Sequence, residues 1–251
     1  MGTVSVTVSR PAALALSPVL VRQARRVRQR TPRLPEASGE RTGIEFTAHA
    51  TSLLRLLVVG ESTAAGIGVT ELRDALPRQL AMMLAARRQA NVAWSMSART
   101  GATASFAARE LAPVAPTGQD LAVIIVGVND ALKFTSRRVW RANLDQLIDE
   151  LAKHVRPGGQ LALAGLPDLG RFGTFPQPLR ALLGWHARAL DRDLRTIAKR
   201  RAGVIYLAMP PVSWPELFAA DGFHPSAAAY RVLAAYFADA LATKIDKEGI
   251  R

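Results

Sequence analysis

The stretch Leu53-Leu54-Arg55-Leu56-Leu57-Val58-Val59-Gly60-Glu61-Ser62-Thr63-Ala64-Ala65-Gly66 decides the fold. It begins as a nearly unbroken apolar run, which is typical of a strand buried on both faces of a parallel sheet. The run stops at Gly60, and Ser62 follows where the strand gives way to a loop. Ligands bind at the carboxyl ends of strands in open α/β sheets. Ser62 therefore fits either a nucleophile with a base elsewhere in the chain or an ordinary turn or cap serine.

Four more apolar runs follow, and segments of helical pattern separate them. Strands are expected near residues 91–96, 120–128, 161–166 and 204–207, and helices over 72–88, 140–155, 179–201 and 226–241. This alternation predicts a five-stranded parallel sheet with helices on both faces, a three-layer α/β/α domain. We expect that domain to cover residues 51–245, after a basic N-terminal arm and linker over residues 1–50.

Composition excludes some classes of site. The chain has 251 residues and no cysteine, so disulfides and thiolate metal sites are absent. No His, Asp and Glu spacing indicates a metal site, and we expect neither a metal nor a cofactor. The net charge is +13, but no basic stretch alternates with aromatic residues as a nucleic-acid stacking surface requires. A solvated basic surface is the favoured interpretation, and no specific nucleic-acid partner is expected.

The N-terminal region is the most basic part of the chain. The apolar run Pro11–Val21 is too short to span a membrane, and the arginines that follow it oppose export. We therefore expect a cytoplasmic protein. A surface helix packed on the domain is the favoured interpretation of residues 11–30, with peripheral contact at the inner face of the membrane as the alternative. Residues 31–43 are expected to form a linker with little regular structure.

Several reactive residue types follow predicted strands or lie in the loops beyond them. His224 can serve as a general base, and Asp221 lies three residues before it in a glycine-containing loop. Asn129 can offer a side-chain amide, and Gly101 a backbone N–H, to a developing oxyanion. Each residue alone has a common structural role. Because parallel strands end on the same side of a sheet, the fold would bring these residues to one rim.

In this order the segments resemble the sequence blocks of the SGNH (GDSL-type) hydrolases. The matching segments are Gly60-Glu61-Ser62, Gly101, Gly127-Val128-Asn129-Asp130 and Asp221-Gly222-Phe223-His224. The resemblance implies a flavodoxin-like fold with Ser62 as nucleophile, His224 as base and Asp221 as its orienting partner. It also implies an oxyanion hole formed by Ser62, Gly101 and Asn129. Glu61 replaces the usual Asp of the first block, a difference that bears on loop geometry.

The expected activity is metal-independent hydrolysis of small-molecule carboxylic esters, or alternatively thioesters, through an acyl-enzyme on Ser62. Phe134, Phe172 and Phe175 are expected to hold the acyl group, whereas Trp185 is more consistent with the core. The alternative function is a non-catalytic binding protein on the same scaffold, recruited to a membrane or a nucleic acid by the basic arm.

Overall fold

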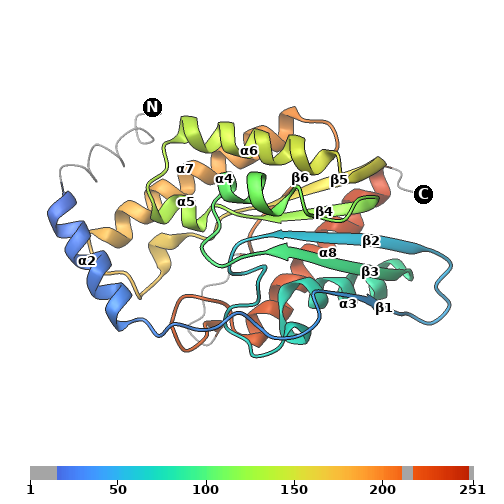
Figure 1. The fold of residues 1–251 in the computed structure, drawn as a ribbon, viewed down its shortest axis with the longest axis horizontal. Coiled ribbons are helices and arrows are strands. Elements are labelled where there is room, and N and C mark those ends of the chain that lie inside the picture. Colours follow the sequence, from blue (N-terminus) through green and yellow to red (C-terminus); the bar gives the residue numbers. More distant parts are fainter. Residues whose placement is uncertain (1–15, 211–216, 249–251) are drawn as a thin grey trace.

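A six-stranded sheet forms the middle layer of the computed structural model, which describes residues 16–210 and 217–248 (Figure 1). The spatial order is β1-β3-β2-β4-β5-β6, and β2 to β6 are parallel. The α/β class is therefore confirmed, with one strand more than predicted. The strands are β1 (Thr42–Glu45), β2 (Leu53–Gly60), β3 (Asn91–Ala98), β4 (Gln119–Ile125), β5 (Val155–Ala164) and β6 (Val204–Leu207).

Helices cover both faces of the sheet. The helices are α2 (Ser17–Arg30), α3 (Leu76–Arg88), α4 (Ala104–Phe106), α5 (Val128–Leu132), α6 (Arg137–Ala152), α7 (Leu179–Arg200) and α8 (Ala227–Glu248). A 3₁₀ turn precedes α3, and a π-helical turn continues α4. One apolar cluster packs α3 and α8 against one face, while a second contains residues of α2, α6 and α7. This is the predicted three-layer arrangement.

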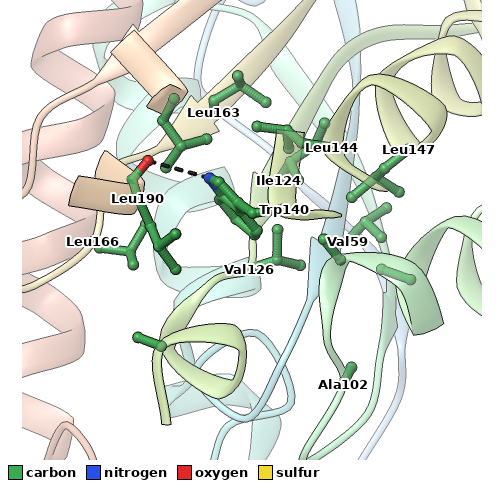
Figure 2. Close-up of a cluster of buried hydrophobic side chains, with 14 of the residues drawn as sticks. Val59, Ala102, Ile124, Val126, Trp140, Leu144, Leu147, Leu163, Leu166 and Leu190 are labelled. Atoms are coloured by element: carbon green, nitrogen blue, oxygen red, sulfur yellow. Dashed lines mark hydrogen bonds between the residues drawn. The ribbon is translucent and has the colours of Figure 1, made fainter. Parts of the chain in front are cut away.

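Trp140 shows how the second cluster is held together. Its side chain is fully buried, and Figure 2 shows it among aliphatic side chains of the sheet and of α6. The indole N–H donates a hydrogen bond of 3.2 Å to the carbonyl oxygen of Leu190 on α7. A buried indole needs such an acceptor, and this bond fixes α6 against α7.

The unpredicted strand β1 lies within and just after the segment interpreted as a linker. Most of residues 31–41 lack regular structure, but Thr42–Glu45 pairs antiparallel with β3. A side chain on Gly43 would overlap the Trp94 indole, and Glu45 accepts a hydrogen bond from Trp94 Nε1 at 3.3 Å. Four residues at a sheet edge carry too little periodicity to be seen in sequence. The boundary at residue 50 stays a prediction, although β1 belongs to the sheet.

β5 also begins earlier than expected. Helix α6 ends at Ala152, and β5 starts at Val155, so Pro157-Gly158-Gly159 lies inside the strand. Val155 pairs with Gln119, after which the register shifts before Leu121. The irregularity accommodates the proline and glycines, which in sequence predict a turn.

Candidate functional site

Ser62 lies in a tight turn directly after β2. A side chain at Gly60 would overlap the carbonyl oxygen of Ile125 on β4, so only glycine lets the two strands end this close together. The backbone N–H groups of Ala64 and Ala65 donate to the carbonyl oxygen of Glu61 at 2.9 and 3.0 Å. These bonds close the turn, and Ser62 keeps 8% of its surface exposed.

His224 and Asp221 meet Ser62 although they lie about 160 positions further along the chain. The Oγ of Ser62 is 3.0 Å from Nε2 of His224, and Nδ1 of His224 is 2.6 Å from Oδ2 of Asp221. An ionised Asp221 requires that Nδ1 carry the proton. Nε2 is then the acceptor, and the Ser62 hydroxyl donates to it.

The surroundings of Asp221 favour its carboxylate form. Its side chain is almost entirely buried, which by itself opposes ionisation. The hydrogen bonds from the His224 ring and from the backbone N–H groups of His224 and Phe223 outweigh burial, and together they lower the pKa of Asp221. The N–H bonds to Oδ1 measure 3.0 and 2.9 Å. Asp221 is thus a fixed negative charge behind the imidazole.

Backbone hydrogen bonds close the loop from Leu217 to Ser226, which we call the His224 loop. Ala219 N donates to His224 O at 2.8 Å, and Ser226 N donates to Leu217 O at the same distance. Thr174 Oγ1, from the loop after β5, donates to Gly222 O at 2.6 Å. The imidazole is therefore held from two directions.

Gly68 allows the His224 loop to approach the Ser62 turn. Gly68 has a φ of +106°, and a Cβ there would overlap the carbonyl oxygen of Pro225. We expect Gly68→Ala to push the His224 loop away and to lower kcat/KM for an ester by about tenfold or more, because small displacements of catalytic groups are costly.

Gly118→Ala is the matched control for Gly68→Ala. Gly118 also has a positive φ, +74°, but no atom lies within 4 Å of its Cβ position. Steady-state kinetics with circular dichroism as the folding check compares the two variants. Equal losses in both would contradict the role given to the close approach at Gly68.

Three groups that can donate to an oxyanion follow neighbouring strands. Ser62 follows β2, Gly101 follows β3, and Asn129 follows β4, and the three strands are adjacent. Among residues 16–210 and 217–248, no acceptor is found for the backbone N–H of Ser62 or of Gly101. Gly101 has a φ of +80° and open space where a side chain would project. Both N–H groups are therefore free to bind a ligand.

Glu61 holds Asn129 in place, a role that sequence reasoning missed. Its carboxylate accepts hydrogen bonds from Val128 N and Asn129 N, each at 3.0 Å, and from Asn129 Nδ2 at 2.5 Å. One N–H of the Asn129 amide is thereby used, and the second is left for a ligand. Burial raises the pKa of Glu61 to about 7, against the effect of these three hydrogen bonds.

Two further carboxylates brace the turn that carries Gly101. Buried Asp130 accepts a hydrogen bond from Ala104 N at 2.9 Å. Glu36, from the irregular segment before β1, accepts from both the N–H and the hydroxyl of Thr100 at 2.7 Å. Because both contacts join segments distant in sequence, no local pattern could have indicated them. The predicted linker thus supports one of the site turns.

A cavity of about 360 Å³ opens beside Ser62 and His224. Much of its wall is apolar and includes Leu166, Phe172 and Phe218. The polar part of the lining is internally paired. Tyr206 and Arg195 both bond to Asp191, at 2.8 and 2.9 Å, and Arg188 and Arg171 lie 2.7 and 3.9 Å from Asp168. The cavity therefore offers largely apolar surface, and each of the arginines in its lining lies beside a carboxylate.

The predicted acyl-binding residues separate in the structure. Phe172 lines the cavity, whereas neither Phe134 nor Phe175 is among its lining residues. Phe175 is buried behind it, with ring centroids 6.5 Å from Phe172 and 5.7 Å from Phe223. Phe134 stacks on His186 at 5.3 Å. Trp185 is 49% exposed, so the core interpretation of that residue is wrong.

No group of three or more His, Asp or Glu side chains suited to a metal ion occurs within the described ranges. A family model described as the GDSL-like lipase/acylhydrolase family matches residues 58–232, a range that includes Ser62, Asp221 and His224. The chain belongs to this family. The match stops short of α2 and β1, which are therefore additions to the part that the family model describes.

A GDSL-like esterase of Mycobacterium tuberculosis, Rv1075c, is similar to this GDSL-family chain. The two are 32% identical over 206 residues, which cover 77% of this chain and 64% of the relative. The chain thus spans just under two thirds of that relative's length. The relative's name describes it as an esterase.

Solved structures share the fold at low sequence identity. The psychrotrophic esterase EstA from Pseudoalteromonas sp. superposes with a TM-score of 0.57 and 16% identity, over 76% of this chain and 98% of that chain. A lipase/acylhydrolase from Enterococcus faecalis gives 0.56 and 20%, over 76% and 96%. These likenesses confirm the fold of this GDSL-family member.

Proposed function

We propose that this protein hydrolyses carboxylic esters of uncharged, apolar acyl groups through an acyl-enzyme on Ser62. The observation that carries the proposal is the hydrogen-bonded chain from Ser62 through His224 to Asp221 at the mouth of a largely apolar cavity. The proposal also draws on family membership and on the name of the M. tuberculosis relative.

In the first half-reaction, the Ser62 Oγ attacks the ester carbonyl carbon while Nε2 of His224 takes the hydroxyl proton. Asp221 stabilises the imidazolium that forms. The N–H groups of Ser62 and Gly101 and the free N–H of Asn129 are proposed to bind the oxyanion. The intermediate collapses, and His224 gives its proton to the departing alcohol oxygen. Water then repeats these steps on the acyl-enzyme and releases the acid.

The cavity lining favours neutral acyl groups. Burial, followed by the hydrogen bond to Asp191, raises the pKa of Tyr206, so its hydroxyl stays protonated and donates to Asp191. Asp191 also accepts from Leu166 N at 3.0 Å. Because Asp191 and Arg195 neutralise each other, this part of the lining offers no net charge to attract a charged acyl terminus.

Hydrolysis of p-nitrophenyl esters from acetate to palmitate tests the proposal. We expect the wild type to hydrolyse these esters, and the chain length at which kcat/KM is highest measures how much of the acyl chain the cavity accommodates. Ser62→Ala serves as the blank. No hydrolysis of any ester by the wild type above that blank would contradict the proposal and favour the non-catalytic binding function.

Location and membrane contact are also proposals. No helix among residues 16–210 and 217–248 is both long and apolar enough to cross a membrane. We propose a cytoplasmic protein with contact at the inner face of the membrane through residues 11–30. Of these, residues 11–15 lie outside the described residues, and the rest fall on or next to α2.

A further inference from the structure

Helix α2 attaches to the protein by a narrow face. Leu20 is buried in the apolar cluster that contains α6 and α7, and Val27 packs against it two turns later. Gln23 lies between them in the helix and forms hydrogen bonds with Gln177 and Leu179. The rest of α2 is largely exposed, so most of the helix circumference is turned away from the domain.

The exposed face of α2 is strongly basic. It carries five arginines and no acidic residue, and none of the five has a carboxylate partner among the described residues. Elsewhere in the described chain many exposed arginines are paired, such as Arg41 with Glu36. The five exposed arginines of α2 are Arg22, Arg25, Arg26, Arg28 and Arg30.

Apolar side chains flank this arginine face. Val19 and Val21 are 47% and 49% exposed. At helical spacing, Val21 shares a side with Arg25, and Val19 shares a side with Arg22 and Arg26. These exposed valines lie beside arginines that have no carboxylate partner among the described residues. The combination suits the membrane interface, where arginines contact anionic headgroups and small apolar side chains reach the start of the acyl chains. A stacking surface for RNA would need aromatic residues, and α2 has none.

Hydrogen bonds also connect α2 to a loop of the candidate functional site. Gln23 Nε2 donates to Gln177 O at 2.6 Å, and Gln23 Oε1 accepts from Leu179 N at 3.2 Å. These residues end the loop after β5, which lines the cavity through Phe172 and binds the His224 loop through Thr174. In Figure 1 the arrowheads of β2, β3 and β4 point toward the end of the molecule where α2 lies.

We propose that α2 lies in the plane of an anionic phospholipid surface and holds the mouth of the cavity against it. The substrate class that follows is an acyl ester presented by the membrane, which deepens the proposed function and rests on it. Arginine attraction to the headgroups supplies most of the binding, so the association weakens as salt screens the surface charge.

Vesicle flotation of the full-length chain carrying Ser62→Ala tests the docking step without hydrolysing the lipid. We expect binding to phosphatidylcholine vesicles that contain about 30 mol% of the anionic lipid phosphatidylglycerol. We expect little binding to vesicles of phosphatidylcholine alone. Adding Arg22→Gln, Arg25→Gln and Arg26→Gln should weaken the binding by about tenfold or more.

The matched control removes the same charge elsewhere through Arg109→Gln, Arg138→Gln and Arg192→Gln, at exposed positions on other helices. It should bind vesicles like its parent. Equal losses in both triple variants, or no binding by the parent at low salt, would overturn the proposal. Tighter binding to a single-stranded RNA than to the vesicles at the same salt would also overturn it.

Hydrolysis of a soluble p-nitrophenyl ester separates this proposal from the proposed function. With Ser62 intact, the Arg22/Arg25/Arg26 variant should keep wild-type kcat/KM, which also shows that it is folded. If the wild type does not hydrolyse the ester while its Ser62→Ala form binds vesicles, the ester-hydrolase proposal fails and the docking surface remains.

Discussion

Replacing Ser62 with alanine is expected to lower kcat for p-nitrophenyl butyrate by about a thousandfold or more. The hydroxyl is placed to attack because it is hydrogen-bonded to the His224 ring at 3.0 Å. Alanine removes the nucleophile but leaves the cavity intact, so a bound ester would depend on water alone. Binding of a product acid should change little, which equilibrium titration can measure.

Ser52→Ala provides a serine control at the opposite end of β2, where the residue is exposed and contacts no site residue. It should keep wild-type kcat. The double variant Ser62→Ala/His224→Ala should lose no more activity than Ser62→Ala, because a base without a nucleophile has no proton to take. A much larger loss in the double variant would show that His224 acts outside the proposed chain.

Glu61→Gln is expected to lower kcat by about a hundredfold with little change in KM, since it disturbs a group that acts on the transition state. The amide offers only one acceptor oxygen. At least one of the three donors now bonded to Glu61, which come from Val128 and Asn129, must then face an NH₂ group. The Asn129 amide would lose its fixed orientation. Glu61 is therefore a positioning residue for the proposed oxyanion hole.

Glu61→Asp is the conservative control, because it keeps the carboxylate and restores the residue usual in this family at that position. We expect a smaller loss of kcat than in Glu61→Gln, as the shorter side chain still accepts several hydrogen bonds. If Glu61→Gln retains wild-type kcat, the Glu61–Asn129 contact has no part in catalysis and the proposal for Asn129 is weakened.

Stability provides a second readout for Glu61. Burial holds its pKa at about 7, above the value of 4.5 of a solvated glutamate in the unfolded chain. Between these pH values the folded protein therefore binds more protons than the unfolded chain at this group. The contribution of Glu61 to the free energy of unfolding should fall as pH rises from 4.5 to about 7.

Glu61→Gln cannot titrate, so its free energy of unfolding should decline less over that range. Urea denaturation at several pH values compares it with the wild type. Parallel pH dependences in the two proteins would contradict the role assigned to burial of Glu61.

The five parallel strands could be predicted because each contains apolar residues that the sheet buries, most clearly the run from Leu56 to Val59. β1 escaped prediction because Thr42–Glu45 is short and depends on Trp94, which lies far away in sequence. The start of β5 escaped because Pro157 and its neighbouring glycines predict a turn, while pairing with β4 overrides that preference.

In the candidate site, the residue types of Ser62, His224 and Asp221 indicated their chemistry, and the structure places them within hydrogen-bond distance. The part played by Glu61 could not be foreseen. It depends on a loop that is distant in sequence, and a buried carboxylate looks the same in sequence as an exposed one. Phe134 shows the converse difficulty, because an apolar side chain in a nearby loop does not reveal which cavity it lines.

The most direct measurement is labelling of the full-length protein with a fluorophosphonate, followed by intact mass determination and peptide mapping. Such a reagent phosphonylates a serine only when a base activates the hydroxyl. We expect one adduct, on the peptide containing Ser62, with loss of ester hydrolysis in proportion to labelling and no adduct in Ser62→Ala or His224→Ala. An unlabelled Ser62 in a protein that still hydrolyses esters, or labelling of another residue in step with inactivation, would contradict the assignment of Ser62 as the nucleophile.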